Sequence, residues 1–388
     1  MDEPRIDTSV AVIGAGAAGL AAAVQLRRAG VPDVVVVERE DAPGRGSTSR
    51  ANGGVRAQFA TPINIAFSRF TIQQLDELDR ASDGRVGLRR VGYLFMAGTP
   101  EREDALRRTY ELQAASGVEV EWLSPAEVLD LAPFVRAEDL RAGTFCASDG
   151  IVDPGGVAGA LWAEGRRLGV RYLLGEDVQA IEERAPGVVL RTGARVVEAE
   201  WAVNAAGPHA AAVAALAGLE VPVTPYRRNL ACTEPLTGHP DPTPMCIDLD
   251  TGVLIRREGG GGFLLAYSNP ADPPGFETAF DPAFLDAVGE RIGHRFPFLE
   301  AVAIDQRKCW AGLYPETPDH HAIVDAPPVH PRFVQCIGFG GHGIMHSLAA
   351  GQAVAELVVQ GRCTTFDLRT LRLSRFEEGD AVTESVVL

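Results

Sequence analysis

The residues best suited to chemistry lie near the start of the chain, in a glycine-rich turn between two apolar runs. The turn Gly14-Ala15-Gly16-Ala17-Ala18-Gly19 follows the apolar run 10–13, and a second apolar run at 34–37 ends in Glu38. Glycines at this spacing allow a tight turn, close approach of a pyrophosphate, and close packing of the next helix on the strand. Glu38 is placed to accept hydrogen bonds from both hydroxyls of an adenosine ribose, and it would repel a 2′-phosphate. The stretch therefore predicts a βαβ unit that binds an adenine dinucleotide.

Two arginines outside this unit are candidates for binding an anionic substrate. Arg56 ends a polar, glycine-rich loop at 44–56, and Arg256 follows the β-like run 252–255. A guanidinium offers a planar pair of donors to a carboxylate. A second interpretation stays open for Arg56, in which it holds the cofactor loop or pairs with a surface acid.

Histidines occur in two arrangements that raise the question of a metal site. His342 and His346 are four residues apart, and Asp319-His320-His321 is a compact cluster. Neither arrangement matches the H-E-x-x-H pattern of zinc enzymes. We therefore predict no metal.

Composition limits the classes of protein to which the chain can belong. With 388 residues, 46% of them hydrophobic, the chain exceeds what one domain usually holds and favours two domains. Its formal charge of -16 disfavours binding to nucleic acid or to an anionic membrane. Lys308 is the sole lysine, so a Walker-type phosphate loop is absent and Schiff-base chemistry would depend on that one residue.

The cysteines and the N-terminal residues indicate the cellular compartment of the protein. The six cysteines (Cys146, Cys232, Cys246, Cys309, Cys336 and Cys363) include no C-x-x-C pair, which fits a reducing compartment. Asp2 and Glu3 stand where a signal peptide would be basic, and no apolar stretch reaches membrane-spanning length. These features predict a soluble, cytoplasmic protein without a membrane span.

The order of the predicted elements indicates two interleaved domains. After a helix ending near residue 78 we expect a strand at 93–95, a helix at 101–116, a strand at 118–123, and a helix that starts at the capping box of Ser124 and Glu127. A helix at 154–168 then precedes strands at 170–174, 188–190 and 201–204. Residues 222–310 are rich in Pro and Gly with short β-like runs, which favours an antiparallel sheet. The strand 334–337, the glycine turn 338–343 and the helix 344–359 return to the dinucleotide-binding type.

This order of motifs resembles the D-amino-acid oxidase and sarcosine oxidase family of flavoproteins over essentially the whole chain. The residues that carry the resemblance are 14–38, 47–59, 149–154, 204–208, 313–319 and 338–343. The pattern looks closest to sarcosine and glycine oxidases and to the flavin subunits of proline dehydrogenases. The resemblance implies an α/β fold in which a discontinuous Rossmann-like FAD-binding domain (1–84, 142–222 and 319–388) is joined to an α+β substrate domain on an antiparallel sheet (85–141 and 223–318).

The resemblance also implies which residues hold FAD. Glu38 would bind the ribose, the backbone of Val178 the adenine, and the 47–49 loop the pyrophosphate and the flavin edge. The glycine turn 338–343 would lie against the flavin pyrimidine ring, where a helix beginning at Gly343 and Ile344 stabilises negative charge. The full predicted set is Gly14, Gly16, Ala17, Ala18, Gly19, Glu38, Arg39, Arg45, Ser47, Thr48, Ser49, Gly53, Gly54, Val178, Ala206, Gly207, Gly312, Gly338, Gly340, Gly341, His342, Gly343 and Ile344.

Three positions depart from the sarcosine oxidase pattern. Met345 stands where those enzymes carry a carboxylate-binding lysine, so a substrate carboxylate must be held differently. Gly312 replaces the cysteine that attaches FAD covalently, and Cys309 is displaced by three residues, so FAD is expected to be non-covalent. Leu264 stands where a lysine is thought to activate oxygen, which disfavours a strictly sarcosine-like oxidase.

These observations predict an FAD-dependent amine or amino-acid oxidoreductase. It would oxidise a C–N bond of an amino acid or a small secondary or N-methyl amine by hydride transfer to flavin N5, with Arg56, Arg256, Tyr314 and His342 on the substrate side. Tyr314 has an equally simple interpretation as a core tyrosine. Two alternatives stay open: a 2-hydroxyacid or polyol dehydrogenase on the same scaffold, and a flavin-stabilised assembly protein without turnover. A partner subunit and the identity of the electron acceptor are also left open.

Overall fold

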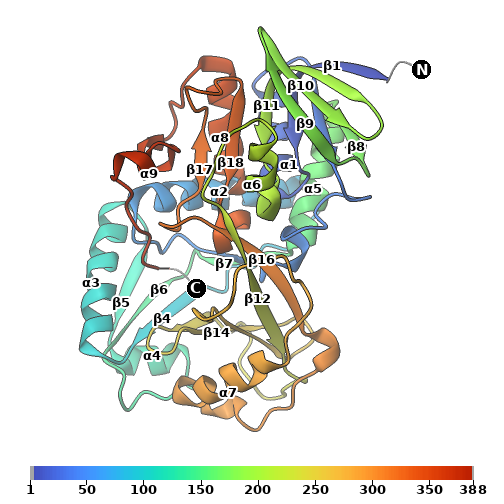
Figure 1. The fold of residues 1–388 in the computed structure, drawn as a ribbon. Helices are drawn as coiled ribbons and strands as arrows, with labels where there is room; N and C mark the ends of the chain where they lie inside the picture. Colours follow the sequence, from blue (N-terminus) through green and yellow to red (C-terminus); the bar gives the residue numbers. More distant parts are fainter. Residues whose placement is uncertain (1–3, 387–388) are drawn as a thin grey trace.

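The computed structural model describes residues 4–386 and divides them between two β-sheets, one in each half of the molecule in Figure 1. The first sheet has the order β17-β18-β11-β1-β2-β8, and the hairpin β9–β10 pairs with β11. Its strands are β1 (Arg5–Ile13), β2 (Val34–Glu38), β8 (Arg171–Leu174), β9 (Val178–Arg184), β10 (Gly187–Thr192), β11 (Val196–Asn204), β17 (Ile323–Asp325) and β18 (Phe333–Ile337). The strands β8, β2, β1, β11 and β18 run parallel, as the valine-rich apolar runs predict.

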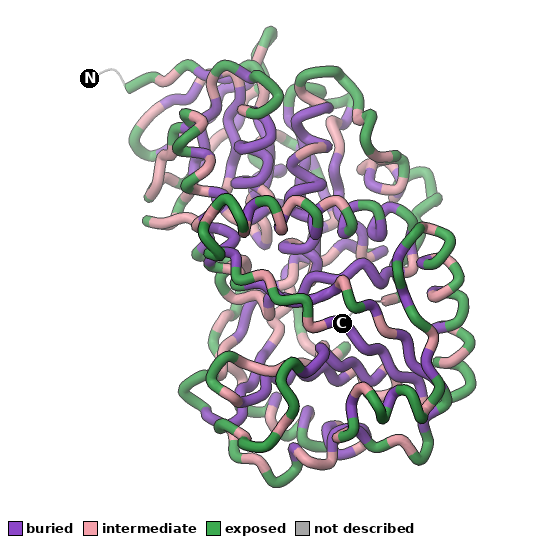
Figure 2. The backbone as a smooth tube through the Cα atoms, turned by 180° about the vertical axis from the view of Figure 1, so that it is seen from behind, coloured by how far each residue is buried: buried purple, intermediate pink, exposed green. Residues whose placement is uncertain are grey.

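Helices cover one face of this sheet, and the β9–β10 hairpin with a short helix covers the other. The first face packs on α1 (Ala17–Arg28), α5 (Pro154–Arg167) and α8 (Gly343–Gln360), and α2 (Pro62–Ala81) packs on α8. The second face packs on β9, β10 and α6 (Ala210–Ala215). Figure 2 shows that the backbone of these central layers is mostly buried, whereas the loops around them are exposed.

The second sheet has the order β16-β12-β15-β14-β13-β4-β6-β5, and its pairs are antiparallel except for β13 and β4. The strands are β4 (Tyr93–Ala97), β5 (Val120–Leu123), β6 (Ala142–Cys146), β12 (Thr224–Cys232), β13 (Met245–Asp248), β14 (Val253–Arg257), β15 (Phe263–Tyr267) and β16 (Trp310–Glu316). Two helices, α4 (Pro125–Leu131) and α7 (Ala283–Arg295), pack on one face. The other face carries an apolar cluster that includes Tyr93, Leu264 and a residue of α3 (Pro100–Ala115).

The predicted architecture is confirmed, and the pairing adds one detail about where the domains meet. The expected boundary at residue 142 falls at the start of β6, and β6 pairs with β4 and β5 of the second sheet. The chain returns to the first half through the two-residue strand β7 (Gly150–Ile151), which pairs with β3 (Gly54–Val55). The last helix is α9 (Arg375–Glu378), beside the first sheet in Figure 1.

Local signals in the sequence place two helix starts correctly. The Ser124 hydroxyl accepts a hydrogen bond from the Glu127 amide at 3.4 Å, and the Glu127 carboxylate accepts one from the Ser124 amide at 2.8 Å. This is the predicted capping box. At α5 the Asp153 carboxylate accepts from the Gly155 amide at 2.9 Å.

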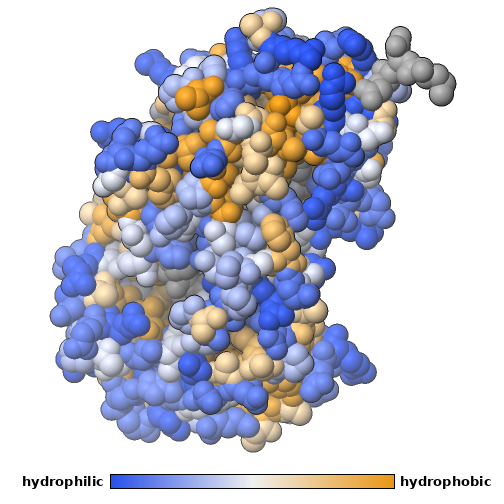
Figure 3. Space-filling model, in the orientation of Figure 1, coloured by the Kyte–Doolittle hydropathy of each residue, from blue (hydrophilic) through white to orange (hydrophobic). Residues whose placement is uncertain are grey.

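The outer surface is mainly polar. Figure 3 shows hydrophilic side chains over most of the visible face, with smaller apolar patches between them. Within residues 4–386, no helix combines the length and the apolar character needed to cross a membrane.

Close packing of α1 on α8 yields a prediction about stability. A Cβ added to Gly351 of α8 would lie 2.6 Å from the backbone carbonyl carbon of Ala21, so a side chain there would push the two helices apart. We expect Gly351→Ala to destabilise the protein by about 2 kcal/mol. A lower melting temperature at unchanged protein concentration is the readout.

A matched control uses Gly289, which is exposed in α7 and has no atom within 4 Å of an added Cβ. Gly289→Ala is expected to leave the melting temperature unchanged or to raise it, because alanine favours helix by about 1 kcal/mol. If Gly351→Ala melts like the parent protein, the α1–α8 contact is looser than described.

Candidate functional site

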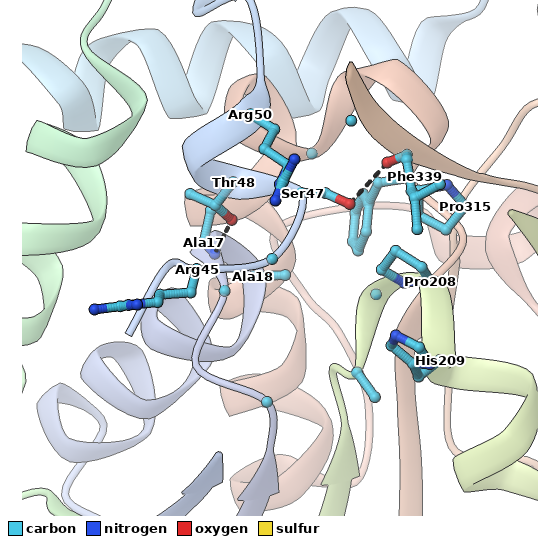
Figure 4. A pocket seen from close by; sticks show the side chains of 18 of the residues that line it. Ala17, Ala18, Arg45, Ser47, Thr48, Arg50, Pro208, His209, Pro315 and Phe339 are labelled. Carbon is cyan, nitrogen blue, oxygen red and sulfur yellow. Dashed lines mark hydrogen bonds between the residues drawn. The ribbon is translucent and has the colours of Figure 1, made fainter. Parts of the chain in front are cut away.

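A pocket of about 580 Å³ lies where the carboxyl ends of the first sheet meet the second sheet. Segments far apart in the sequence surround it, including the turn after β1, the 45–54 loop, and the strands β12 and β16. Figure 4 shows side chains from these segments converging around one space. Of the predicted cofactor residues, those that line the pocket are Gly14, Gly16, Ala17, Ala18, Glu38, Arg39, Arg45, Ser47, Thr48, Gly53, Gly54, Val178, Ala206, Gly207, Gly312, Gly340, Gly341, Gly343 and Ile344.

The turn after β1 requires glycine for two separate steric reasons. Gly14 has a φ of +106°, and a Cβ there would lie 2.5 Å from the carbonyl oxygen of Ala205. A Cβ at Gly19 would lie 2.0 Å from the carbonyl oxygen of Gly14. Gly19 therefore does not line the pocket, and its role is to let α1 close onto the turn.

Glu38 lies at one end of the pocket with its carboxylate already oriented. One oxygen accepts a hydrogen bond from the Ala15 amide at 2.6 Å, and the other accepts from the Glu40 amide at 2.9 Å. Each carboxylate oxygen has a further lone pair, so the side chain can also accept from ribose hydroxyls. Val178 lines the same pocket.

The 45–54 loop connects the start of α1 to the second sheet. The Thr48 hydroxyl accepts a hydrogen bond from the Ala17 amide, the first residue of α1, at 3.0 Å. The Ser47 hydroxyl donates to the Leu313 carbonyl of β16 at 2.7 Å. Both residues point into the space drawn in Figure 4. Ser49 does not line the pocket, because its hydroxyl turns back to the Gly46 carbonyl at 3.4 Å.

Glycines allow close packing in the part of the pocket lined by Tyr314 and the start of α8. A Cβ at Gly341 would lie 2.6 Å from the Tyr314 ring, and one at Gly312 would lie 3.0 Å from the Arg50 Cβ. Helix α8 begins here at Gly343, so its N-terminal N–H groups end at the pocket. Gly338 lies outside the lining, where a Cβ would meet Thr317 at 2.7 Å. A carboxylate placed to accept from a ribose and two helix N-termini at one pocket of this size fit a flavin dinucleotide.

An aromatic stack lies beside the pocket and was not predicted. The rings of His209 and Phe276 are 4.7 Å apart at an angle of 14°, and both residues line the pocket. Phe276 comes from the loop after β15 of the second sheet, whereas His209 follows β11 of the first. No local pattern in the sequence predicts a contact between these two segments.

Arg228 is a second residue that sequence reasoning missed. It lines the pocket, is directly opposite Gly312 in the β12–β16 pair, and forms ion pairs with Glu316 at 2.9 Å and Asp272 at 3.3 Å. Its Nε is buried without a hydrogen-bond partner. Tyr314 also lines the pocket, and burial raises the pKa of its hydroxyl, which is therefore a neutral donor at pH 7.

Arg56 is close to this region but does not line the pocket. Its guanidinium lies 3.9 Å from the centre of the Phe59 ring and donates hydrogen bonds to the carbonyl oxygens of Gln58 and, at 2.7 Å, of Val386. It is 1% exposed, and burial lowers its pKa, although it remains a cation at pH 7. In the structure, Arg56 therefore holds its own loop and the segment that ends at Val386, and it does not line the pocket.

The segment that carries Arg56 is held by a buried carboxylate. Asp149 accepts hydrogen bonds from the Ala57 amide at 2.7 Å and from the Gln58 side chain at 3.1 Å. Burial raises the pKa of Asp149 to about 6. Arg256 is also outside the pocket lining, and it pairs with Glu258 at 2.6 Å.

The structure places His342 between two residues that line the pocket, Gly341 and Gly343. Its ring does not line the pocket but packs edge-on against Phe59 at 4.8 Å and lies 5.4 Å from His346. Burial lowers the pKa of His342 well below its ordinary value and that of His346 to about 3, so both rings are neutral at pH 7.

The three residues of the second cluster, Asp319, His320 and His321, each contact a different partner. Asp319 pairs with Arg375 at 2.7 Å, and His320 faces Glu316 at 3.5 Å. His321 lies 2.9 Å from the Thr61 hydroxyl. Across the part of the chain that the structure describes, His, Cys, Asp and Glu side chains form no group of three or more suited to a metal ion.

Comparison with known proteins identifies the family. The model of the family described as DAO, FAD dependent oxidoreductase, matches residues 9–357. The chain is 29% identical to "FAD-dependent oxidoreductase domain-containing protein 1" of Xenopus laevis, with 97% of this chain and 84% of that protein aligned. It is 28% identical to mitochondrial sarcosine dehydrogenase of Homo sapiens over 91% of this chain, but that match spans 40% of the human protein.

Solved structures confirm the fold. The chain resembles L-proline dehydrogenase from P. horikoshii with a TM-score of 0.90 at 24% identity, covering 98% of this chain and 100% of that one. Glycine oxidase from Geobacillus kaustophilus matches with a TM-score of 0.83 at 25% identity, covering 95% and 99% of the two chains. FAD is the cofactor of this family, in agreement with the pocket described above.

The position of Glu38 predicts its effect on cofactor affinity. Glu38→Gln removes the charge from the ribose acceptor, and the lost charge-assisted hydrogen bonds are worth about 1.5–3 kcal/mol. We expect the dissociation constant of FAD to rise roughly tenfold or more. Titration of the apoprotein with FAD, followed by flavin fluorescence, measures it.

Glu101→Gln is the matched control, because Glu101 is an exposed acid in the first turn of α3 and does not line the pocket. Its affinity for FAD should equal that of the parent protein. Equal FAD affinity in the Glu38 variant would show that the ribose lies elsewhere.

Proposed function

The chain belongs to the DAO family of FAD-dependent oxidoreductases, and from this premise we propose that it oxidises the C–N bond of an amino acid or a small secondary or N-methylated amine. The observation that carries the proposal is a pocket between the two sheets that is lined by Glu38 as well as by Arg228 and Tyr314. A molecule held between Tyr314 and the N-terminus of α8 would lie beside the flavin ring. Bound FAD supplies the acceptor for the hydride.

The names of the relatives support this class of substrate. Sarcosine and dimethylglycine dehydrogenases are among them, and L-proline dehydrogenase and glycine oxidase share the fold. The compounds in these names all join a carboxylate to an amine. We therefore propose an amine that carries a carboxylate as the substrate.

The side chains around the pocket would support the reaction in three ways. The N-terminus of α8 places N–H groups where negative charge develops on reduction. Tyr314 is a neutral donor, and the buried rings of His342 and His346 add no positive charge. The apolar cluster of Tyr93 and Leu264 excludes water from the face of the second sheet that is opposite α4 and α7.

For the substrate carboxylate we propose Arg56, which is buried and would bind the carboxylate in addition to the contacts by which it holds its own loop. The charges of Glu384 and Asp149 lie near its guanidinium, but its hydrogen bonds are to carbonyl oxygens and not to a carboxylate. A carboxylate would make stronger, charge-assisted hydrogen bonds to the same guanidinium. Arg228, in contrast, is already paired with Glu316 and Asp272.

The substrate class is tested by flavin reduction without oxygen. The FAD-loaded protein is mixed anaerobically with sarcosine, proline, glycine and matching 2-hydroxyacids, and bleaching of the yellow absorption band is followed. We expect bleaching by one or more of the amines and none by the hydroxyacids. Bleaching by hydroxyacids alone would assign the site to alcohol oxidation, and no bleaching by either set would favour a flavoprotein without turnover.

The role of Arg56 is tested with the same assay. Arg56→Ala should raise the concentration of amino acid needed for half-maximal reduction about thirtyfold, corresponding to about 2 kcal/mol for a lost charge pair. The FAD content should stay unchanged. Arg256→Ala is the comparison, because Arg256 has its own partner Glu258, and it should behave as the parent protein. If Arg256→Ala raises this concentration and Arg56→Ala does not, the carboxylate is bound by Arg256. If Arg56→Ala loses FAD, Arg56 belongs to the cofactor loop.

A further inference from the structure

The segment 382–386 ends at the junction of the two halves of the molecule, far from the helix that precedes it. Figure 1 shows the chain leaving α9 and running to the middle of the molecule. Val382, Thr383 and Ser385 are exposed, whereas Glu384 is 1% exposed. An acidic side chain is buried only when polar partners replace its water, so the segment is bound at a specific place.

Four donors surround the Glu384 carboxylate. One oxygen accepts from the amides of Ala60 and Val386 at 2.9 and 3.0 Å. The other accepts from the Thr61 hydroxyl at 2.8 Å and the Asn64 side chain at 3.0 Å. Thr61 is the N-cap of α2 and does not cap that helix with its own side chain. Glu384 therefore provides the negative charge at the N-terminus of a 20-residue helix.

This anchor positions the neighbouring residue on Arg56. The Val386 carbonyl accepts a hydrogen bond from Arg56 at 2.7 Å, and the Val386 side chain packs against the apolar cluster of Tyr93 and Leu264. Arg56 belongs to the segment directly before α2, so the same short stretch of chain holds both the guanidinium and the anchor. The Val386 carbonyl binds Nη2 of Arg56, so a carboxylate that binds this nitrogen from the same side would have to displace Val386.

We propose that residues 382–386 form a latch, anchored by Glu384, that competes with an anionic substrate for Arg56. The proposal rests on the proposed function in that Arg56 is taken as the carboxylate partner. With the latch seated, Val386 satisfies the buried guanidinium and covers the substrate side. A substrate carboxylate displaces the carbonyl because a charge-assisted pair is stronger than a hydrogen bond to a neutral oxygen. Glu384 is a positioning residue that acts on Arg56 through Val386 and also through its own negative charge, which lies near the guanidinium.

The test uses the FAD-loaded protein and acetate as a small carboxylate probe. Acetate binding is read from the shift it causes in the flavin absorption spectrum. Hydrogen exchange of the peptide 380–386 reports whether the latch is seated, because the Glu384 amide donates to the Asp319 carbonyl and the Val386 amide to the Glu384 carboxylate. In the parent protein, saturating acetate should raise exchange in this peptide.

The Glu384→Ala variant should exchange rapidly in 380–386 without acetate and should bind acetate at least fivefold more tightly. Glu378→Ala is the matched control: Glu378 is an exposed acid in the same region that pairs with Arg372. It should match the parent protein in both measurements. If Glu384→Ala loses FAD, a variant whose chain ends at Val382 is used in its place. This variant should also bind acetate at least fivefold more tightly than the parent protein.

Two outcomes overturn the latch, and one overturns the role of Arg56 separately. Unchanged exchange in Glu384→Ala would show that Glu384 is not the anchor. Faster exchange with unchanged acetate affinity, while Arg56→Ala binds acetate weakly, would show that the segment does not compete. If Arg56→Ala binds acetate as tightly as the parent protein, the carboxylate site is elsewhere, and the proposed role of Arg56 fails whether or not the segment is anchored by Glu384.

Discussion

Parallel pairing at the centre of the first sheet is the constraint on which the cofactor pocket depends. The last residue of β1, Ile13, is paired with Val37 of β2 on one side and with Asn204 of β11 on the other. The next amides continue these ladders, because Gly14 donates to the Val37 carbonyl at 2.8 Å and Ala205 donates to the Ile13 carbonyl at 2.9 Å. Three strands therefore end at one edge, and the turns that follow them have to share that space.

The second sheet completes the pocket through hydrogen bonds to the 45–54 loop. Ser47 donates to the Leu313 carbonyl, the Trp310 indole donates to the Arg50 carbonyl at 2.8 Å, and Arg50 donates to the Ala311 carbonyl at 3.0 Å. All three bonds join a loop of the first half to β16. The part of the pocket lined by the 45–54 loop and β16 is therefore a junction between the halves, and its shape depends on how both sheets are placed.

Buried charged side chains near this junction are stabilised by polar partners. The chain carries a formal charge of -16, yet the buried ionised groups each have polar partners: Arg375 binds Asp319, and Glu384 binds four donors. A buried charge without such partners would cost several kcal/mol. Arg56 meets the same requirement with carbonyl oxygens, which neutralise it less completely than a carboxylate would. The nearby carboxylates of Glu384 and Asp149 also stabilise the charge of Arg56, without a direct hydrogen bond to it.

The sequence by itself determined the features that depend on neighbouring residues. The glycine turn with Glu38, the capping box at Ser124 and the start of α8 were all predicted, because each follows from backbone geometry and short-range hydrogen bonds. The same patterns, together with the family resemblance, indicated two interleaved domains. Most of the predicted cofactor residues line the pocket for this reason.

Only the tertiary structure decided what surrounds the substrate side. It placed β6 in the second sheet, turned His342 toward Phe59, and brought Arg228 opposite Gly312. It also joined Arg56 to Val386, which is 330 residues away in the chain. Contacts of this kind arise from the packing of whole sheets and helices, and no spacing within one segment encodes them. The local chain therefore specified where FAD binds, and long-range packing specified what a substrate meets there.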